Sequence, residues 1–184
     1  MRIIAGAFRG RVLKSPAGDR TRPTSDRLRE TLFNIIAPRL SDSTRFLDLC
    51  AGTGAVGIEA LSRGVGFTAF VDKSRRACAL IEENLDLLAI EESRTDLVCT
   101  TAESYLGRET VRPWDFIYFD PPYSHNYGPA LHAVGHRAEA LLSEDGVLVA
   151  EHHFKHPIPE MSGQIRRWRI VKQGESCLSF FERA

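Results

Sequence analysis

Short apolar runs and longer helical patterns alternate through most of the chain. The runs of strand length occupy residues 46–50, 68–72, 95–100, 115–120 and 146–152. Apolar residues recur with helical spacing within 55–64, 74–90 and 130–142. Strands that alternate with helices predict βαβ units, and therefore an α/β fold with a parallel sheet that carries helices on both faces.

The two ends of the chain depart from this alternation. Runs 168–175 and 177–183 are joined by a tight turn containing glycine, without a helix, which predicts an antiparallel hairpin that closes the sheet. Residues 2–14 predict a β-hairpin around a glycine-containing turn. Helix-capping residues at 24–26 precede a helical apolar pattern that should end near Pro38. We expect residues 1–45 to form an extension packed on a catalytic domain of residues 46–184.

Composition is that of an ordinary globular protein. The chain has 184 residues, of which 43% are hydrophobic and 26% charged, which suits one domain without stabilising disulfides. No apolar run approaches the length of a membrane span, and Arg9 interrupts the N-terminal apolar stretch too early for a secretory signal. We expect a cytoplasmic protein. Cys50, Cys99 and Cys177 lie in apolar strand-like runs and should be buried, reduced thiols.

Net charge is zero over the whole chain but is unevenly distributed. Residues 1–45 hold ten basic against four acidic side chains, a net +6, so the remainder carries −6. Such asymmetry suggests a polyanionic partner. A solvated basic face is the alternative that charge alone leaves open.

A glycine-rich loop follows the first strand of the predicted sheet. Gly52, Gly54 and Gly57 form the pattern G-x-G-x-x-G between a strand and a helix, and Asp72 ends the next strand. This arrangement is typical of a site where a ligand lies over the glycines and an acidic side chain binds a ribose hydroxyl. The glycines alone favour a nicotinamide or flavin dinucleotide.

Asp48 changes this interpretation. It lies four residues before Gly52, near the carboxyl end of the same strand, where a carboxylate would repel a pyrophosphate and attract a cation. S-adenosylmethionine (SAM) carries an ammonium, a sulfonium and a ribose but no phosphate. Asp48, the glycines and Asp72 therefore predict a SAM site.

The fourth predicted strand ends in Asp120-Pro121-Pro122-Tyr123. The two prolines stop the strand and fix the backbone at the carboxyl edge of the sheet, where ligands bind in α/β folds. The Asp120 carboxylate and the Pro121 carbonyl can each accept an N–H from a planar amine, which makes its nitrogen a better nucleophile. Tyr123 can stack on the planar group. The segment predicts methyl transfer to an exocyclic or amide nitrogen.

Together these motifs resemble the class I SAM-dependent methyltransferases that methylate amino groups and carry [DN]-P-P-[FYW]. The blocks RIIAGAFRGRVL, RPTSDRLRETLFNIIAP, DLCAGTGAVGIEALSRG and DPPY are similar to the RsmD family, which methylates N2 of a guanine in 16S ribosomal RNA. The resemblance is close over residues 2–125. It implies a Rossmann-like, mostly parallel seven-stranded sheet and SAM as the cofactor.

The resemblance also implies roles for individual residues. Catalytic positions fall on Asp120, Pro121, Pro122 and Tyr123. Cofactor contacts fall on Asp48, Gly52, Gly54, Asp72, Ala102 and Glu103, the last two after the third strand, where such enzymes meet the adenine. The chain departs from the family pattern at Cys50, where an aromatic residue is frequent. Relatives in the wider fold place Asp or Asn where this chain has Ala102.

The RNA partner implied by the resemblance is 16S ribosomal RNA within the small subunit or its assembly intermediate, with an unpaired or flipped target base. We expect RNA contacts at Arg9, Arg11, Arg22 and Arg27, and neither a membrane nor an obligate protein partner. A second basic run is formed by Arg166, Arg167, Arg169 and Lys172 beside Trp168. It either extends the RNA surface or guards an edge strand.

Four alternatives stay open from the residues. The same chemistry could serve adenine N6 in DNA or RNA, or a protein amide. A nicotinamide-dependent oxidoreductase would use the glycine loop but not Asp48 or DPPY. A non-catalytic RNA-binding module would retain the fold without turnover. His152, His153 and His156 lie close enough in sequence to suggest a metal, but methyl transfer from a sulfonium needs none, so we expect polar residues after a strand.

Overall fold

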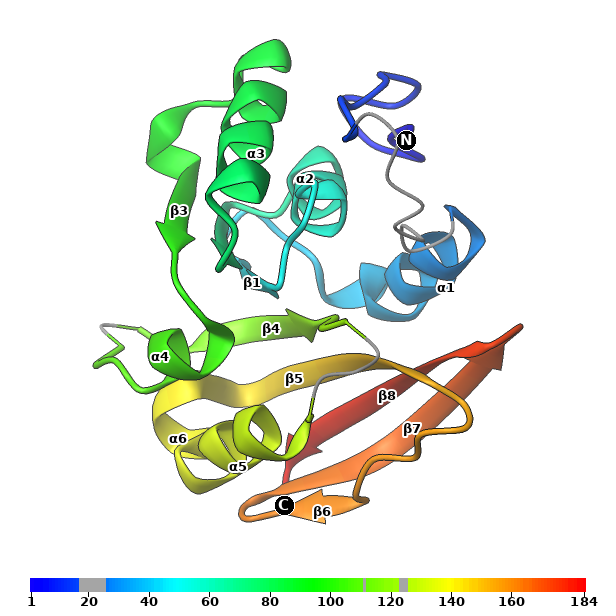
Figure 1. Cartoon of the computed structure of the whole chain (residues 1–184), viewed down its shortest axis with the longest axis vertical. Coiled ribbons are helices and arrows are strands. Elements are labelled where there is room, and N and C mark those ends of the chain that lie inside the picture. Colours follow the sequence, from blue (N-terminus) through cyan, green and yellow to red (C-terminus); the bar gives the residue numbers. More distant parts are fainter. Residues whose placement is uncertain (17–25, 111, 123–125) are drawn as a thin grey trace.

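One mixed sheet organises the protein, and its strands follow the order β3-β2-β1-β4-β5-β8-β7-β6 (Figure 1). In this computed structural model we describe residues 1–16, 26–110, 112–122 and 126–184. The parallel part consists of β1 (Arg45–Leu49), β2 (Phe67–Asp72), β3 (Thr95–Cys99), β4 (Trp114–Phe119) and β5 (Leu142–His153). The antiparallel part consists of β6 (Met161–Ser162), β7 (Ile165–Gln173) and β8 (Ser176–Arg183). The predicted α/β fold and C-terminal hairpin are confirmed, but among the described residues the sheet has eight strands rather than the expected seven, because the two-residue β6 pairs with β7 at its edge.

Helices cover both faces of the sheet (Figure 1). One layer holds α1 (Asp26–Ile36), α2 (Ala55–Ser62) and α3 (Arg75–Leu87). The other holds α4 (Ala102–Leu106), α5 (Gly128–His136) and α6 (Ala138–Leu141). The pattern over 130–142 is therefore two helices that meet at Arg137 rather than one, and α4, with five residues, is too short to show helical periodicity in the sequence.

The alternation of side chains along each strand separates the core into layers. Leu47 and Leu49 of β1 pack with α4, α5 and α6, whereas Phe46 packs with α1 and α2. The α1 residues Leu28 and Leu32 are buried in the same cluster as Phe46, so α1 is part of the core rather than an appendage. Helix α1 thus joins the basic N-terminal segment directly to the sheet.

Strand register places the ends of three strands at one edge of the sheet. Leu49 pairs with Val71 of β2 and with Phe119 of β4. The residues that follow, Cys50, Asp72 and Asp120, therefore emerge at the same level from three adjacent strands. Because all three strands are parallel, this level is the carboxyl edge of the sheet.

The N-terminal segment forms a short, irregular version of the predicted β-hairpin, in which the Ile3 amide donates to the Arg11 carbonyl at 3.0 Å and the Leu13 amide to the Met1 carbonyl at 2.9 Å. Within the described residues it contains one isolated antiparallel bridge, between Arg2 and Val12, and no strand. The backbone amides of Ile4 and Ala5 donate instead to the carboxylate of Glu59, at 2.8 and 3.0 Å. Glu59 is fully buried in α2. The two halves of the segment therefore pair antiparallel as predicted, but the pairing does not extend into full strands because the Ile4 and Ala5 donors bind a side chain of α2.

The cysteines differ in their exposure, and all are free thiols. Cys177 is buried and Cys50 is partly buried, but Cys99 is exposed. The prediction of burial is wrong for Cys99 because it ends β3, which lies at the edge of the sheet and has one neighbouring strand. No helix among the described residues combines the length and apolarity that a membrane crossing requires.

Candidate active site

A pocket of about 380 Å³ lies at the carboxyl edge of the sheet. Its lining includes five of the residues that the sequence predicts for the site, namely Asp48, Gly52, Asp72, Asp120 and Pro122. Gly54, Ala102, Glu103 and Pro121 are not in the lining that the described residues form. Tyr123 and Arg22 lie outside the described residues. The structure therefore brings together the predicted cofactor and catalytic segments around one cavity.

Asp48 is buried at the end of β1 and faces the first turn of α2. Its carboxylate accepts a hydrogen bond of 2.8 Å from the backbone N–H of Gly57. Burial raises the pKa of Asp48 to about 7, and the neighbouring Asp72 carboxylate acts in the same direction, while the Gly57 hydrogen bond opposes both. A positive ligand group in the pocket would therefore compensate a carboxylate that is costly to ionise without one.

Asp72 shapes the glycine loop from the end of β2. One carboxylate oxygen accepts a hydrogen bond of 2.9 Å from the Gly52 amide, and the other accepts one of 2.8 Å from the Ser74 amide. Each oxygen has a second lone pair available. The side chain can thus hold the loop and still accept hydroxyl hydrogen bonds from a ligand.

Cys50 marks the centre of an acidic cluster. The carboxylates of Asp72, Asp120, Asp48 and Glu103 all lie near enough to disfavour its thiolate, and together with the dominant effect of burial they raise the pKa of the thiol to about 12. Cys50 also adopts a left-handed backbone, with φ of 62°, which is costly for a residue with a side chain and is found at functional turns. Four carboxyl groups from four segments therefore surround one position.

Two of the glycines serve local packing. Gly54 precedes α2 with φ of 75°, a conformation that favours glycine. A Cβ on Gly57 would lie 2.3 Å from Cε1 of Phe70, so a side chain there would push α2 away from β2. The close approach of α2 to the sheet is what allows the Gly57 amide to reach Asp48.

Several residues that line the pocket were not predicted from the sequence. Tyr118 lines the pocket, and its hydroxyl donates a 2.6 Å hydrogen bond to the buried carboxylate of Glu151. Met1 and Pro16 of the N-terminal segment also contribute. Lys73 directly follows Asp72 at the carboxyl edge, so the strand-end rule could have identified it. No sequence signal indicates Met1 or Pro16, because their position depends on how the N-terminal segment docks.

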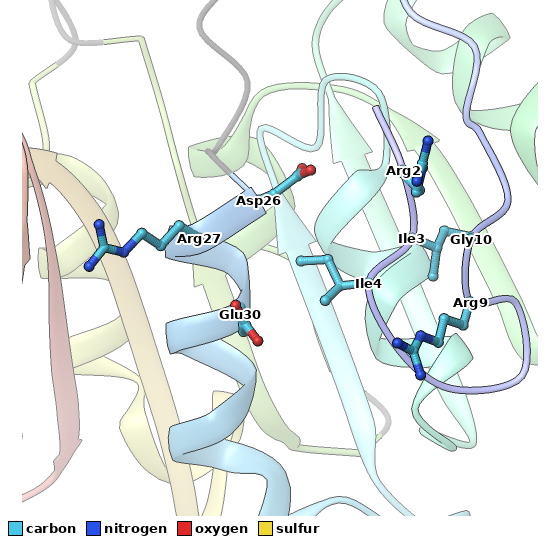
Figure 2. Close-up of a pocket in the computed structure, with 8 residues that line it drawn as sticks. All are labelled: Arg2, Ile3, Ile4, Arg9, Gly10, Asp26, Arg27 and Glu30. Carbon is cyan, nitrogen blue, oxygen red and sulfur yellow. The ribbon is translucent and has the colours of Figure 1, made fainter.

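A second hollow, of about 480 Å³, separates the N-terminal segment from α1 (Figure 2). Two predicted RNA contacts, Arg9 and Arg27, lie on its opposite walls, and Figure 2 shows that Arg27 extends away from the N-terminal segment. The acidic residues Asp26 and Glu30 share the lining. Arg11 lies outside this lining, and its guanidinium donates to the Leu87 carbonyl at 3.2 Å. The hollow is lined by both basic and acidic side chains, so its charge alone does not favour binding of an anion.

The three histidines at the end of β5 and in the turn after it are not arranged around a metal site within the described residues. Across the described ranges, no group of three or more His, Cys, Asp or Glu side chains is arranged to hold a metal ion. His152 is instead buried, with Nε2 at 2.9 Å from the Ser179 hydroxyl.

Comparison with known proteins gives consistent matches. The sequence profile of the family described as "Conserved hypothetical protein 95" matches residues 1–182. The chain is 37% identical to "Putative rRNA methyltransferase YlbH" of Bacillus subtilis, over the full chain and 99% of that protein. It is 39% identical to "Ribosomal RNA small subunit methyltransferase D" of Escherichia coli over 67% of this chain and 60% of that protein.

A solved structure extends the match to the whole fold. The Escherichia coli protein titled "Putative methyltransferase yhhF" superposes with a TM-score of 0.85 at 29% identity, covering 100% of this chain and 97% of that one. The predicted Rossmann-like methyltransferase fold is confirmed. The chain therefore belongs to the family described as "Conserved hypothetical protein 95", that of the RsmD methyltransferases, and is a methyltransferase.

Proposed function

We propose that this protein transfers a methyl group from SAM to the exocyclic N2 amine of a guanine in 16S ribosomal RNA. The observation that carries the proposal is the acidic cluster around Cys50, which joins the predicted cofactor acids Asp48 and Asp72 to the catalytic Asp120. Cofactor site and amine site thus share one cavity.

The charge of the pocket selects among cofactors. The three carboxyl groups of the lining, those of Asp48, Asp72 and Asp120, repel the pyrophosphate of a nicotinamide or flavin dinucleotide placed beside them. They favour a ligand with an ammonium and a sulfonium. We assign the methionine end of SAM to Asp48 and its ribose to Asp72, whose oxygens retain free lone pairs beside Gly52. Ala102 and Glu103 begin α4 beside this site and stay our candidates for the adenine.

SAM, when bound, supplies an electrophilic methyl group. Asp120 would accept one N–H of the target amine and the Pro121 carbonyl the other, which localises the nitrogen lone pair for attack. The Asp120 carboxylate would also take up the proton that the amine releases on methylation and pass it to solvent. Tyr118 and Glu151 hold the floor of the pocket through their 2.6 Å hydrogen bond. Positioning and electrostatics account for most of the rate.

The substrate assignment rests on the relatives. Their printed names specify ribosomal RNA, and in the Escherichia coli protein the small subunit. Guanine N2 is inaccessible to a buried acceptor while the base is stacked in a helix, so the target is flipped or unpaired. A small-subunit substrate would place the activity in the cytoplasm. Selection of the nucleotide would depend on the folded shape of the subunit or an assembly intermediate.

Methyl transfer from labelled SAM tests the proposal directly. Unmodified small subunits, naked 16S RNA and duplex DNA are offered in parallel, and labelled nucleosides are identified after digestion. Label in N2-methylguanosine from the ribosomal substrates supports the proposal. Label in a methyladenosine would retain the chemistry and refute the target base. Absence of label, with SAM binding intact, would refute RNA methylation.

A further inference from the structure

A rigid turn follows β5 at the same edge of the sheet as the pocket. His152 is 2% exposed, and its Nδ1 lies 3.2 Å from the His153 carbonyl and 3.1 Å from the His156 carbonyl. Because both partners are acceptors, Nδ1 carries the proton, and Nε2 accepts from Ser179 at 2.9 Å. Burial lowers the pKa of His152 further, which favours this neutral form. The buried side chain of His152 therefore holds the turn in place through its hydrogen bonds to the backbone.

The outer side of this turn presents cations held against an aromatic ring. The Lys172 ammonium lies 3.9 Å from the centroid of Phe154, and the Lys155 ammonium lies 5.7 Å from it. The ring of His153 stacks on Phe154 at 4.9 Å. Attraction between ammonium and ring reduces the freedom of both lysines. We call His153, Phe154, Lys155 and Lys172 the Phe154 cluster.

Neither lysine of the cluster is neutralised by an ion pair. Both are exposed, and across the described part of the chain neither lies within 4.0 Å of a carboxylate. Other cations of β7 differ in this respect, since Arg167 pairs with Glu160 at 2.8 Å and Arg166 with Glu182 at 3.9 Å. In the basic run of β7, Arg166 and Arg167 are therefore paired, whereas among the described residues Arg169 and Lys172 have no carboxylate partner within 4.0 Å.

The cluster lies beside the proposed methyl-transfer site. Phe119 of β4 pairs with Ala150 of β5, so Asp120 is level with Glu151, two residues before His153. Strands β4, β5 and β7 end at the same side of the molecule in Figure 1, and Lys172 is the penultimate residue of β7. The unpaired cations are therefore at the rim next to an acidic pocket.

We propose that the Phe154 cluster is a docking surface for the RNA backbone that flanks the target nucleotide. The acidic pocket repels phosphates, so a polyanion whose base enters it has to be held by cations outside it. Lys155 and Lys172 supply that charge in a fixed place against the Phe154 ring. This inference rests on the proposed function, because it assumes that RNA is the substrate.

The test compares two changes of charge on the same strand and turn. The variant Lys155→Ala/Lys172→Ala removes the cluster cations, and Arg166→Ala removes a cation at the other end of β7. Affinity for naked 16S RNA is measured at several salt concentrations, together with KM for RNA, kcat and affinity for S-adenosylhomocysteine. The double variant should bind RNA about tenfold more weakly, with the log–log salt slope reduced by about two. Its kcat and cofactor affinity should match wild type, as should all parameters of Arg166→Ala.

A conservative variant distinguishes an effect of charge on RNA affinity from an effect of altered folding. Phe154→Leu keeps both lysines and an apolar side chain but removes the ring that orients them, so RNA affinity should fall less than in the double variant. Wild-type affinity and KM in the double variant would overturn the docking surface, as would an equal loss in Arg166→Ala. Normal action on naked RNA combined with loss on assembled subunits would also overturn it and indicate a protein contact. Failure of the proposed function is recognised separately, because wild type itself would then methylate no RNA.

Discussion

The Asp48 carboxylate and the backbone amide of Gly57 are joined by a 2.8 Å hydrogen bond that ties the end of β1 to the first turn of α2. That single amide does not offset the burial of the carboxylate beside Asp72, and the pKa of Asp48 rises to about 7. Ionisation of Asp48 near neutral pH is therefore unfavourable in the free protein and favourable once a cation is near.

The first prediction concerns pH. Because the pKa of Asp48 is raised on folding from 3.8 to about 7, its contribution to stability is fully present below about pH 4 and is lost as pH rises through 7. Affinity for SAM has the opposite trend, since the ionised form binds the cation, and should increase up to about pH 7. Urea denaturation and calorimetric titration across pH measure the two effects.

The variant Asp48→Asn provides the control for this prediction, because the amide oxygen can still accept from Gly57. It should remove the contribution of Asp48 to the pH dependence of stability and of SAM affinity. It should also weaken SAM binding by roughly tenfold or more. The other charged side chains of the pocket lining, Asp72, Lys73, Arg76 and Asp120, remain in place. A variant that retains the wild-type pH dependence of SAM affinity would show that another group governs it.

The second prediction concerns Asp120. Replacement by Ala removes the proposed acceptor of the amine proton, and kcat should fall by about 100-fold or more. Asp120→Asn, which keeps an oxygen acceptor without charge, should lose less. Binding of S-adenosylhomocysteine should stay close to wild type in both, since this ligand lacks the sulfonium. Full turnover by Asp120→Ala in a single-turnover assay would contradict the assigned role.

The third prediction concerns the contact between α2 and β2. In Gly57→Ala the new Cβ would meet Phe70 at 2.3 Å, and overpacking of this kind costs about 1–3 kcal/mol, against a gain in helix propensity of about 1 kcal/mol. We expect a net loss of unfolding free energy together with weaker SAM binding, because the Asp48 hydrogen bond is displaced.

Gly107→Ala is the matched control for Gly57→Ala. Its Cβ would lie 3.5 Å from the nearest neighbour, the Glu103 carbonyl, and its φ of −75° suits alanine. Its stability in urea should be unchanged or higher by about 0.4–1 kcal/mol. Equal midpoints for the two variants would mean that α2 tolerates displacement from the sheet.

The parts of the site that the sequence predicts are those fixed by local rules. Asp72 and Asp120 lie at the ends of their apolar runs and Asp48 is the penultimate residue of its strand, and parallel strands bring such ends to one edge. The glycine loop was equally predictable, because its residues lie between a strand and a helix in sequence. These features need no knowledge of distant contacts.

The parts that the sequence did not predict depend on contacts between distant residues. The N-terminal segment reaches the pocket through Met1 and Pro16 only because Glu59 and other side chains, more than 50 residues away, bind its backbone. The same contacts explain why the predicted hairpin is limited to a short antiparallel pairing. The apolar pattern of residues 2–14 indicates which side chains are buried. It does not indicate which groups accept hydrogen bonds from the backbone amides of this segment.

The fourth prediction concerns the basic N-terminal segment. Charge reversal at Arg9 and Arg11 should weaken RNA binding and make it less sensitive to salt, because both guanidinium groups are on the surface. Affinity for S-adenosylhomocysteine should be unchanged. Arg166→Glu serves as the control for a cation elsewhere on the surface. Equal loss of RNA and cofactor binding would instead mean that reversal undocks the segment and its pocket residue Met1.

The last prediction concerns Asn84, a fully buried residue of α3 that links three segments. Its Oδ1 accepts from the Lys14 amide at 2.8 Å, and its Nδ2 donates to the Lys14 carbonyl at 3.2 Å and to the Thr53 carbonyl at 3.1 Å. Thr53 and Pro16, two residues beyond Lys14, line the pocket. Asn84→Ala should therefore lower both stability, by about 2–4 kcal/mol, and cofactor affinity at temperatures where it remains folded.

Two further variants define the role of the Asn84 amide. Asn34 is exposed on α1, so Asn34→Ala should change neither stability nor cofactor affinity. Asn84→Asp keeps the acceptor but faces the Lys14 and Thr53 carbonyls with a carboxylate, and should be less stable than Asn84→Ala at neutral pH. Protonation restores a donor at that oxygen, so Asn84→Asp should regain stability as pH falls, whereas Asn84→Ala should not. Parallel urea profiles for the two variants at every pH would show that the hydrogen bonds to Lys14 and Thr53 contribute little to docking the N-terminal segment.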